Sequence, residues 1–67
     1  MNALQAVTEA LQGGSSVGVA QLMVSTGYSD RAVGEALRFL RRRGDVEIVG
    51  RVKSARGARM TIYRWKP

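Results

Sequence analysis

A small α+β fold, with three helices followed by a two-stranded β-hairpin, is predicted by this sequence of 67 residues. In three segments before about Arg43, apolar residues recur at the three- and four-residue spacing of a helix. After Gly44 the chain changes to two runs rich in β-forming residues. A glycine follows each helical segment, where helices commonly stop. Because a chain of this length suffices for one small core, we expect a single domain over residues 1–67.

The first helix is predicted over residues 3–12, with Asn2 as its N-cap and Gly13 as its stop. Its core-facing side consists of Leu4, Val7, Thr8 and Leu11. The "GGSS" that follows is a connector within the domain, and a short extra strand is expected near Val17.

The second helix is predicted over residues 19–27, with Gly27 in its C-terminal turn. Its apolar residues are Ala20, Leu22, Met23 and Val24. The third helix begins at a cap supplied by Ser29 or Asp30, runs to about Arg43 and ends at Gly44 in the left-handed conformation. Its apolar stripe is Val33, Ala36, Leu37 and Leu40.

The hairpin is predicted from "DVEIVGRVK" and "MTIYRW", joined by "SARGAR" with Gly57 in the turn. Regular alternation would place Val46, Ile48, Gly50 and Val52 on one face of its first strand, and Glu47, Val49, Arg51 and Lys53 on the other. Arg56 and Arg59 flank the turn, so the tip of the hairpin is expected to be positively charged.

The charges divide unequally between the halves of the chain, whose formal net charge is +6. Residues 1–30 contain Glu9 and Asp30 and no Lys or Arg, whereas residues 31–67 contain all 11 basic side chains and three acidic ones. Such segregation favours a polyanionic partner, with nucleic acid first and an anionic membrane second. An alternative use of these charges is solubility, which does not require segregation.

This order of elements resembles the winged helix-turn-helix family of DNA-binding domains over nearly the whole chain. The stretch "VGEALRFLRRRGDVE" is similar to the end of the family's recognition helix, and "TIYRW" is similar to its aromatic-containing last wing strand. Two residues depart from the family pattern. Asp45 stands where an apolar residue is usual, leaving Val46 to anchor the first wing strand, and Gly34 costs an α-helix about 1 kcal/mol relative to alanine. The missing side chain at Gly34 would let the helix approach another backbone closely.

The resemblance implies that the third helix enters the major groove of duplex DNA while the wing contacts phosphates or the adjacent minor groove. The expected base-reading residues are Ser29, Asp30, Arg31, Glu35 and Arg38. The expected phosphate or minor-groove residues are Arg41, Arg42, Arg51, Lys53, Arg56 and Arg59. Glu35 has an alternative role, because its spacing also allows ion pairs with Arg31 and Arg38. Tyr63 and Trp65 lie on one strand face, where packing over the core is the commoner use and base stacking the alternative.

Enzymatic function is not expected from this composition. The chain contains no His and no Cys, and its five carboxylates are scattered among arginines. We therefore expect no metal and no cofactor. The N-terminal residues lack the basic start and long apolar stretch of a signal peptide, and the basic third helix has its apolar side committed to a core, so we expect a cytoplasmic protein that does not bind membranes.

The function expected from these features is duplex-DNA binding by a nucleoid-associated transcriptional regulator of a prokaryote or phage. Two other readings stay open, namely a winged-helix module that binds protein within a larger assembly and a winged helix that binds RNA. The residues do not choose between a homodimer and a complex with a protein partner.

Overall fold

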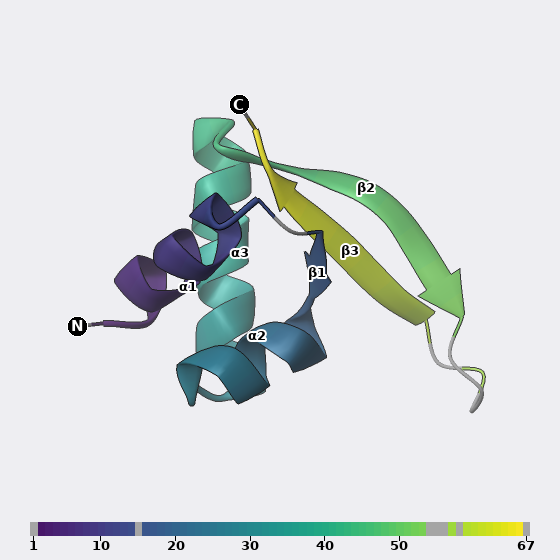
Figure 1. The fold of residues 1–67 in the computed structure, drawn as a ribbon, viewed down its shortest axis with the longest axis horizontal. Helices are drawn as coiled ribbons and strands as arrows, with labels where there is room; N and C mark the ends of the chain where they lie inside the picture. The colour runs from purple at the N-terminus through teal and green to yellow at the C-terminus, as the bar shows by residue number, and fades with distance from the viewer. Residues whose placement is uncertain (1, 15, 54–56, 58, 67) are drawn as a thin grey trace.

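Three helices and a three-stranded antiparallel sheet form the fold, an α+β arrangement of the winged-helix kind (Figure 1). The computed structural model describes residues 2–14, 16–53, 57 and 59–66. The elements follow in the order α1 (Ala3–Gln12), β1 (Val17–Gly18), α2 (Val19–Thr26), α3 (Asp30–Arg43), β2 (Val46–Lys53) and β3 (Arg59–Trp65). The predicted fold class is confirmed, and the short strand expected near Val17 is β1.

The helix ends are determined by local hydrogen bonds. The Asn2 side-chain oxygen accepts a bond of 2.8 Å from the N–H of Gln5, and the Ser29 hydroxyl accepts one of 3.2 Å from Ala32, so each satisfies an otherwise unpaired donor in the first turn. Of the two caps considered for α3, the structure uses Ser29, and Asp30 is the first helical residue. Gly27 and Gly44 end α2 and α3 with φ of 77° and 79°, a conformation that side chains with a Cβ rarely adopt.

The core lies where the three helices meet the base of the sheet. Its buried side chains are Ala6, Val7 and Leu11 of α1, Leu22 of α2, Val33, Ala36, Leu37 and Leu40 of α3, and Val46 of β2. Val46 is only 4% exposed, so it supplies the anchor that Asp45 cannot. Tyr63 and Trp65 are partly buried and pack against this cluster, which confirms their predicted packing role.

Only part of the apolar set of the second helix is used by the core. Leu22 is buried and Met23 is partly buried, but Ala20 is exposed and Val24 is 87% exposed. Because α2 has only eight residues and packs through one side, the core covers fewer of its residues than the four apolar ones. Apolar composition alone does not say which side of a short helix the core will cover.

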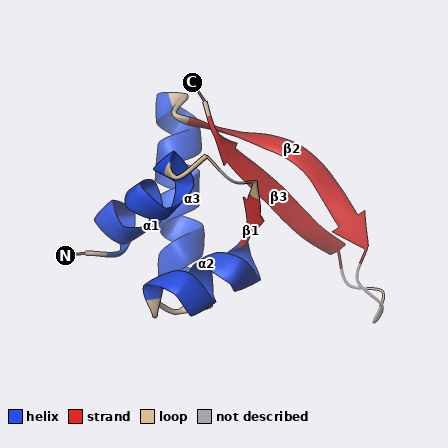
Figure 2. Ribbon diagram, viewed as in Figure 1, coloured by secondary structure: helices blue, strands red, loops and turns tan. Residues whose placement is uncertain are grey.

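The sheet has the strand order β1-β3-β2, so β3 is central and pairs with both neighbours (Figure 2). Val17 and Gly18 of β1 pair with Tyr63 and Ile62. The hairpin of β2 and β3 begins beside the C-terminal end of α3 and extends past the helices, as Figure 1 shows, which makes it a projecting wing. Gly57, between the strands, has a φ of 82°.

The alternation predicted for β2 is wrong beyond Ile48. Ile48 pairs with Tyr63, but the next pair is Gly50 with Ile62, so Val49 is an extra residue that bulges from the ladder. Arg51 then pairs with Thr61 and Lys53 with Arg59. Paired residues share a face, and alternate residues of β3 share a face. Arg51 and Lys53 therefore lie on the face of Val46, Ile48, Tyr63 and Trp65, opposite to their predicted side.

Candidate nucleic-acid interface

Four arginines cover the outer side of α3. Val33, Ala36, Leu37 and Leu40 hold the inner side in the core, so the remaining positions of the helix face solvent. The exposed arginines on these positions are Arg31, Arg38, Arg41 and Arg42, and a fifth, Arg43, is exposed but paired with Asp45 just beyond the helix. A helix of 14 residues thus presents a cationic ridge while its other side is fully used for packing.

Glu35 and Arg31 form an ion pair on this ridge, with 3.5 Å between the Glu35 Oε1 and the Arg31 Nε. Their side chains are 70% and 90% exposed, so water screens the pair and its contribution to stability is small. The pairing proposed as the alternative role of Glu35 is therefore present with Arg31. Because breaking an exposed pair costs little, both side chains remain available to a ligand.

Ser29 and Asp30 stand at the start of α3, beside the ridge. The Ser29 oxygen is engaged as the helix cap, which leaves its O–H as the group that can donate to a ligand. Asp30 is exposed and carries the negative charge that suits a helix N-terminus. Of the five predicted base-reading residues, Ser29 thus has a structural role of its own.

A hollow separates the ridge from the sheet. Its lining comes from α3 and from one residue of β3, and the residues are Asp30, Arg31, Gly34, Glu35, Arg38, Arg41 and Tyr63. The structure brings together four of the five predicted base-reading residues here. Arg41, one of the predicted phosphate-contacting residues, lies beside them. Tyr63 was assigned only a packing or stacking role from the sequence, yet it reaches both the core and this hollow.

The wing continues this charge along one face. Because of the bulge at Val49, Arg51, Lys53 and Arg59 all lie on the hairpin face that carries Tyr63, and all three are exposed. No described carboxylate forms an ion pair with them. Arg56, the remaining predicted wing residue, lies outside the described residues. Tyr63, which lines the hollow beside the α3 ridge, therefore shares its strand face with these three cations.

Two other arginines are engaged elsewhere. Arg43 pairs with Asp45 at 3.4 Å and lies 5.6 Å from the ring centre of Phe39, while Arg64 pairs with Glu47 on the opposite face of the hairpin. Phe39 is 45% exposed and does not belong to the core cluster. Its ring instead supports the Arg43 guanidinium.

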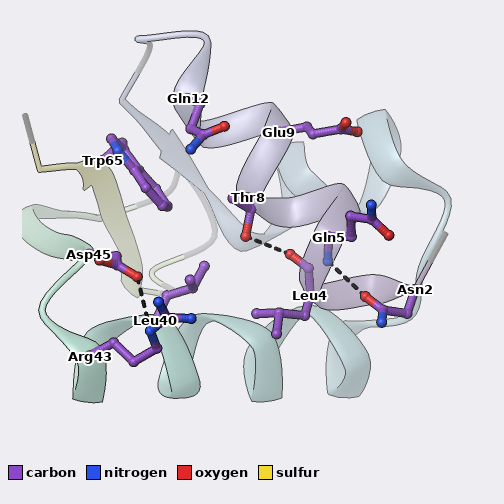
Figure 3. Close-up of a pocket in the computed structure, with 10 residues that line it drawn as sticks. All are labelled: Asn2, Leu4, Gln5, Thr8, Glu9, Gln12, Leu40, Arg43, Asp45 and Trp65. Atoms are coloured by element: carbon purple, nitrogen blue, oxygen red, sulfur yellow. Dashed lines mark hydrogen bonds and ion pairs between the residues drawn. The ribbon is translucent and has the colours of Figure 1, made fainter.

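A second hollow shares no residue with the first (Figure 3). It lies between α1 and the C-terminal end of α3, where Trp65 faces the polar side of α1. Its side chains include Gln5, Glu9 and Gln12, and its one arginine, Arg43, is paired with Asp45 across the dashed line in the figure. With two carboxylates against a single paired cation, this hollow is unsuited to a polyanion.

Within the described part of the chain, no group of three or more acidic, His or Cys side chains could hold a metal ion. Nor does that part contain a helix both long enough and apolar enough to cross a membrane. Comparisons of the chain with family models, curated proteins and solved structures found no match. The case for function therefore comes from the residues of the site itself.

Proposed function

We propose that this protein binds duplex DNA, with α3 in the major groove and the wing on phosphates or in the adjacent minor groove. The observation that carries the proposal is the concentration of exposed cations on the outer side of α3 and on the hairpin face of Tyr63, where Arg51, Lys53 and Arg59 lie. Residues 1–30 contribute no Lys or Arg, so the charge is concentrated on one part of the molecule. Such a surface matches a ligand that carries regularly spaced negative charges.

The dimensions of α3 suit a groove. An α-helix with its side chains is about 10–12 Å across, and the major groove is about 12 Å wide. In this position the exposed side chains of Arg31, Glu35 and Arg38 would reach base edges. Arginine can form two parallel bonds to guanine O6 and N7, and Glu35 can accept a bond from the amino group of cytosine. Arg41, Arg42 and the wing cations would contact phosphates.

This arrangement supports a role in regulating transcription by occupying a DNA site. It also supports preference for duplex DNA over structured RNA, since the deep and narrow major groove of an RNA duplex does not admit a helix. A protein-binding role is the second candidate, and it would not require cations on both α3 and the wing.

The test is a residue-assigned NMR titration of the full chain with a mixed-sequence DNA duplex at two salt concentrations. We expect salt-sensitive shifts in α3 and on the Arg51, Lys53 and Arg59 face of the wing. The five described phosphate-contacting cations predict a slope of log affinity against log salt near −4.5, or roughly a 500-fold loss between about 50 and 200 mM salt. Heparin, a polyanion without grooves, and an RNA hairpin serve as controls.

The outcomes separate the candidates. Shifts of the outer α3 residues with DNA but not with heparin would support insertion into a groove. Equal or tighter binding of the RNA hairpin would favour the RNA reading. Silence of both α3 and the wing at low salt would contradict nucleic-acid binding and favour an acidic protein partner.

A further inference from the structure

Gly34 stands in the middle of α3, a position where glycine weakens a helix. The backbone there does not require it, because the described glycines with positive φ are Gly14, Gly27, Gly44 and Gly57. Packing does not require it either, because a Cβ built at Gly34 would meet no atom within 4 Å. The fold would therefore accept alanine at this position, and the absence of a side chain needs another explanation.

The surroundings of Gly34 suggest that explanation. It lines the hollow between α3 and β3, and the other lining residues are Asp30, Arg31, Glu35, Arg38 and Arg41 of the same helix and Tyr63 of β3. Three arginines thus face two carboxylates, and one of these carboxylates, Glu35, is already paired with Arg31. The Arg41 guanidinium and the Tyr63 phenol are hydrogen-bond donors from opposite elements, and both suit an anionic group, while Arg38 is assigned to base edges. At Gly34 the floor is bare backbone, which lets a ligand come closer than it could to any other type of residue.

We propose that one strand of duplex DNA passes over Gly34, with its sugar–phosphate backbone seated in this hollow between Arg41 and Tyr63. The inference rests on the proposed function. If α3 lies in the major groove and the wing contacts the adjacent minor groove, the strand that separates the two grooves must run between them. The hollow is bounded by α3 on one side and by β3 on the other, which is the path this strand requires.

The close approach determines the strength of the contacts. Hydrogen bonds to phosphate need donor–acceptor distances of about 2.7–3.2 Å, so lifting the strand by roughly an ångström would break bonds on both sides of the hollow. A methyl group at position 34 would cause such a displacement without removing any donor. Gly34 is thus a positioning residue for the DNA backbone.

The experiment compares Gly34→Ala and Gly34→Leu with Gly50→Ala as the matched control. A Cβ at Gly50 would also meet no atom within 4 Å, but Gly50 pairs with Ile62 and so lies on the other face of the hairpin. Affinity for a mixed-sequence duplex is measured by fluorescence anisotropy at several salt concentrations, and the melting temperature of each free variant by circular dichroism.

We expect Gly34→Ala to raise the melting temperature by roughly 4–8 °C, because alanine is the better helix former. The same variant should bind DNA on the order of tenfold more weakly, with a salt slope flatter by about 1. Gly34→Leu should bind more weakly still, and Gly50→Ala should bind as the wild type does.

Wild-type affinity in Gly34→Ala would overturn the inference while leaving the proposed function intact. An equal loss in Gly50→Ala would also overturn it, and so would a fall in the melting temperature of Gly34→Ala, since the helix itself would then need the glycine. If the wild-type protein does not bind the duplex at low salt, both the proposed function and the inference that rests on it are wrong.

Discussion

The arginines differ in the interactions that their side chains form within the protein. Arg43 is engaged twice, by Asp45 and by the ring of Phe39, and Arg64 by Glu47 across the hairpin. Arg38 forms no ion pair with a described carboxylate and lines the hollow. The neighbours that the fold supplies thus decide which arginines are held by other side chains and which remain open to solvent. The exposed ones are the candidates for recognition.

Replacement of Arg38 by alanine should weaken binding to a preferred duplex, selected from a random pool, by roughly 5- to 150-fold, corresponding to about 1–3 kcal/mol for a bidentate guanine contact. Binding to random duplexes should weaken less. Competition binding at fixed salt measures both losses. Arg64→Ala is the matched control, because it removes the same charge from the opposite face of the hairpin. Equal losses on preferred and random DNA would show that Arg38 does not read a base.

Among the elements, the wing is the one whose side-chain placement depends most on strand pairing, because the pairing of β2 with β3 determines which face each β2 residue occupies. The bulge at Val49 makes Arg51 and Lys53 share a face with Arg59 and Tyr63, whereas regular alternation from Val46 would have placed them on the opposite face. The opposite face carries Val52, Met60, Ile62 and the ion pair of Glu47 with Arg64. One extra residue in β2 therefore collects the described wing cations on one side.

The triple substitution of Arg51, Lys53 and Arg59 by alanine should weaken binding to all duplexes alike, since phosphate contacts carry no base information. Loss of three phosphate contacts should flatten the slope of log affinity against log salt by about 2.7. Anisotropy titrations at several salt concentrations give this slope. Val52→Thr, on the other face, should leave it unchanged. A slope that stays the same in the triple variant would remove the wing from the interface.

Over the whole molecule, stability depends on a small core without disulfides, since the chain contains no Cys. The core joins all three helices to Val46 at the base of the wing. Leu37 of α3 lies within it and is 1% exposed. The same helix thus contributes to both features: its inner side packs in the core and stabilises the fold, and its outer side carries the cationic ridge.

Leu37→Ala should reduce the free energy of unfolding by about 2–5 kcal/mol, through lost burial and the cavity left behind. This is a large part of the stability of a small domain. Urea denaturation followed by circular dichroism measures the change. Val24→Ala removes aliphatic surface from an exposed position and should change stability by less than about 0.5 kcal/mol. Similar losses in both variants would contradict the assignment of the core.

The sequence by itself determined the helices, because their ends depend on local chemistry. Asn2 and Ser29 cap the first turns through hydrogen bonds to residues three positions away, and Gly27 and Gly44 adopt the left-handed stops expected of them. The order of elements and the whole apolar stripe of α3 followed from the same short-range rules. The segregation of charge was also visible without the structure.

Only the tertiary structure decided which faces meet. The exposure of Val24, the bulge at Val49 and the place of Tyr63 beside the hollow all depend on partners distant in sequence. Alternation of apolar and polar residues in the sequence predicts that a strand has two faces. The pairing of its residues with the neighbouring strand then determines which face each side chain occupies. For this reason the candidate DNA-contacting residues could be named from the sequence, whereas only the fold brings Tyr63 to the hollow of α3 and Arg51 and Lys53 to the face of Tyr63.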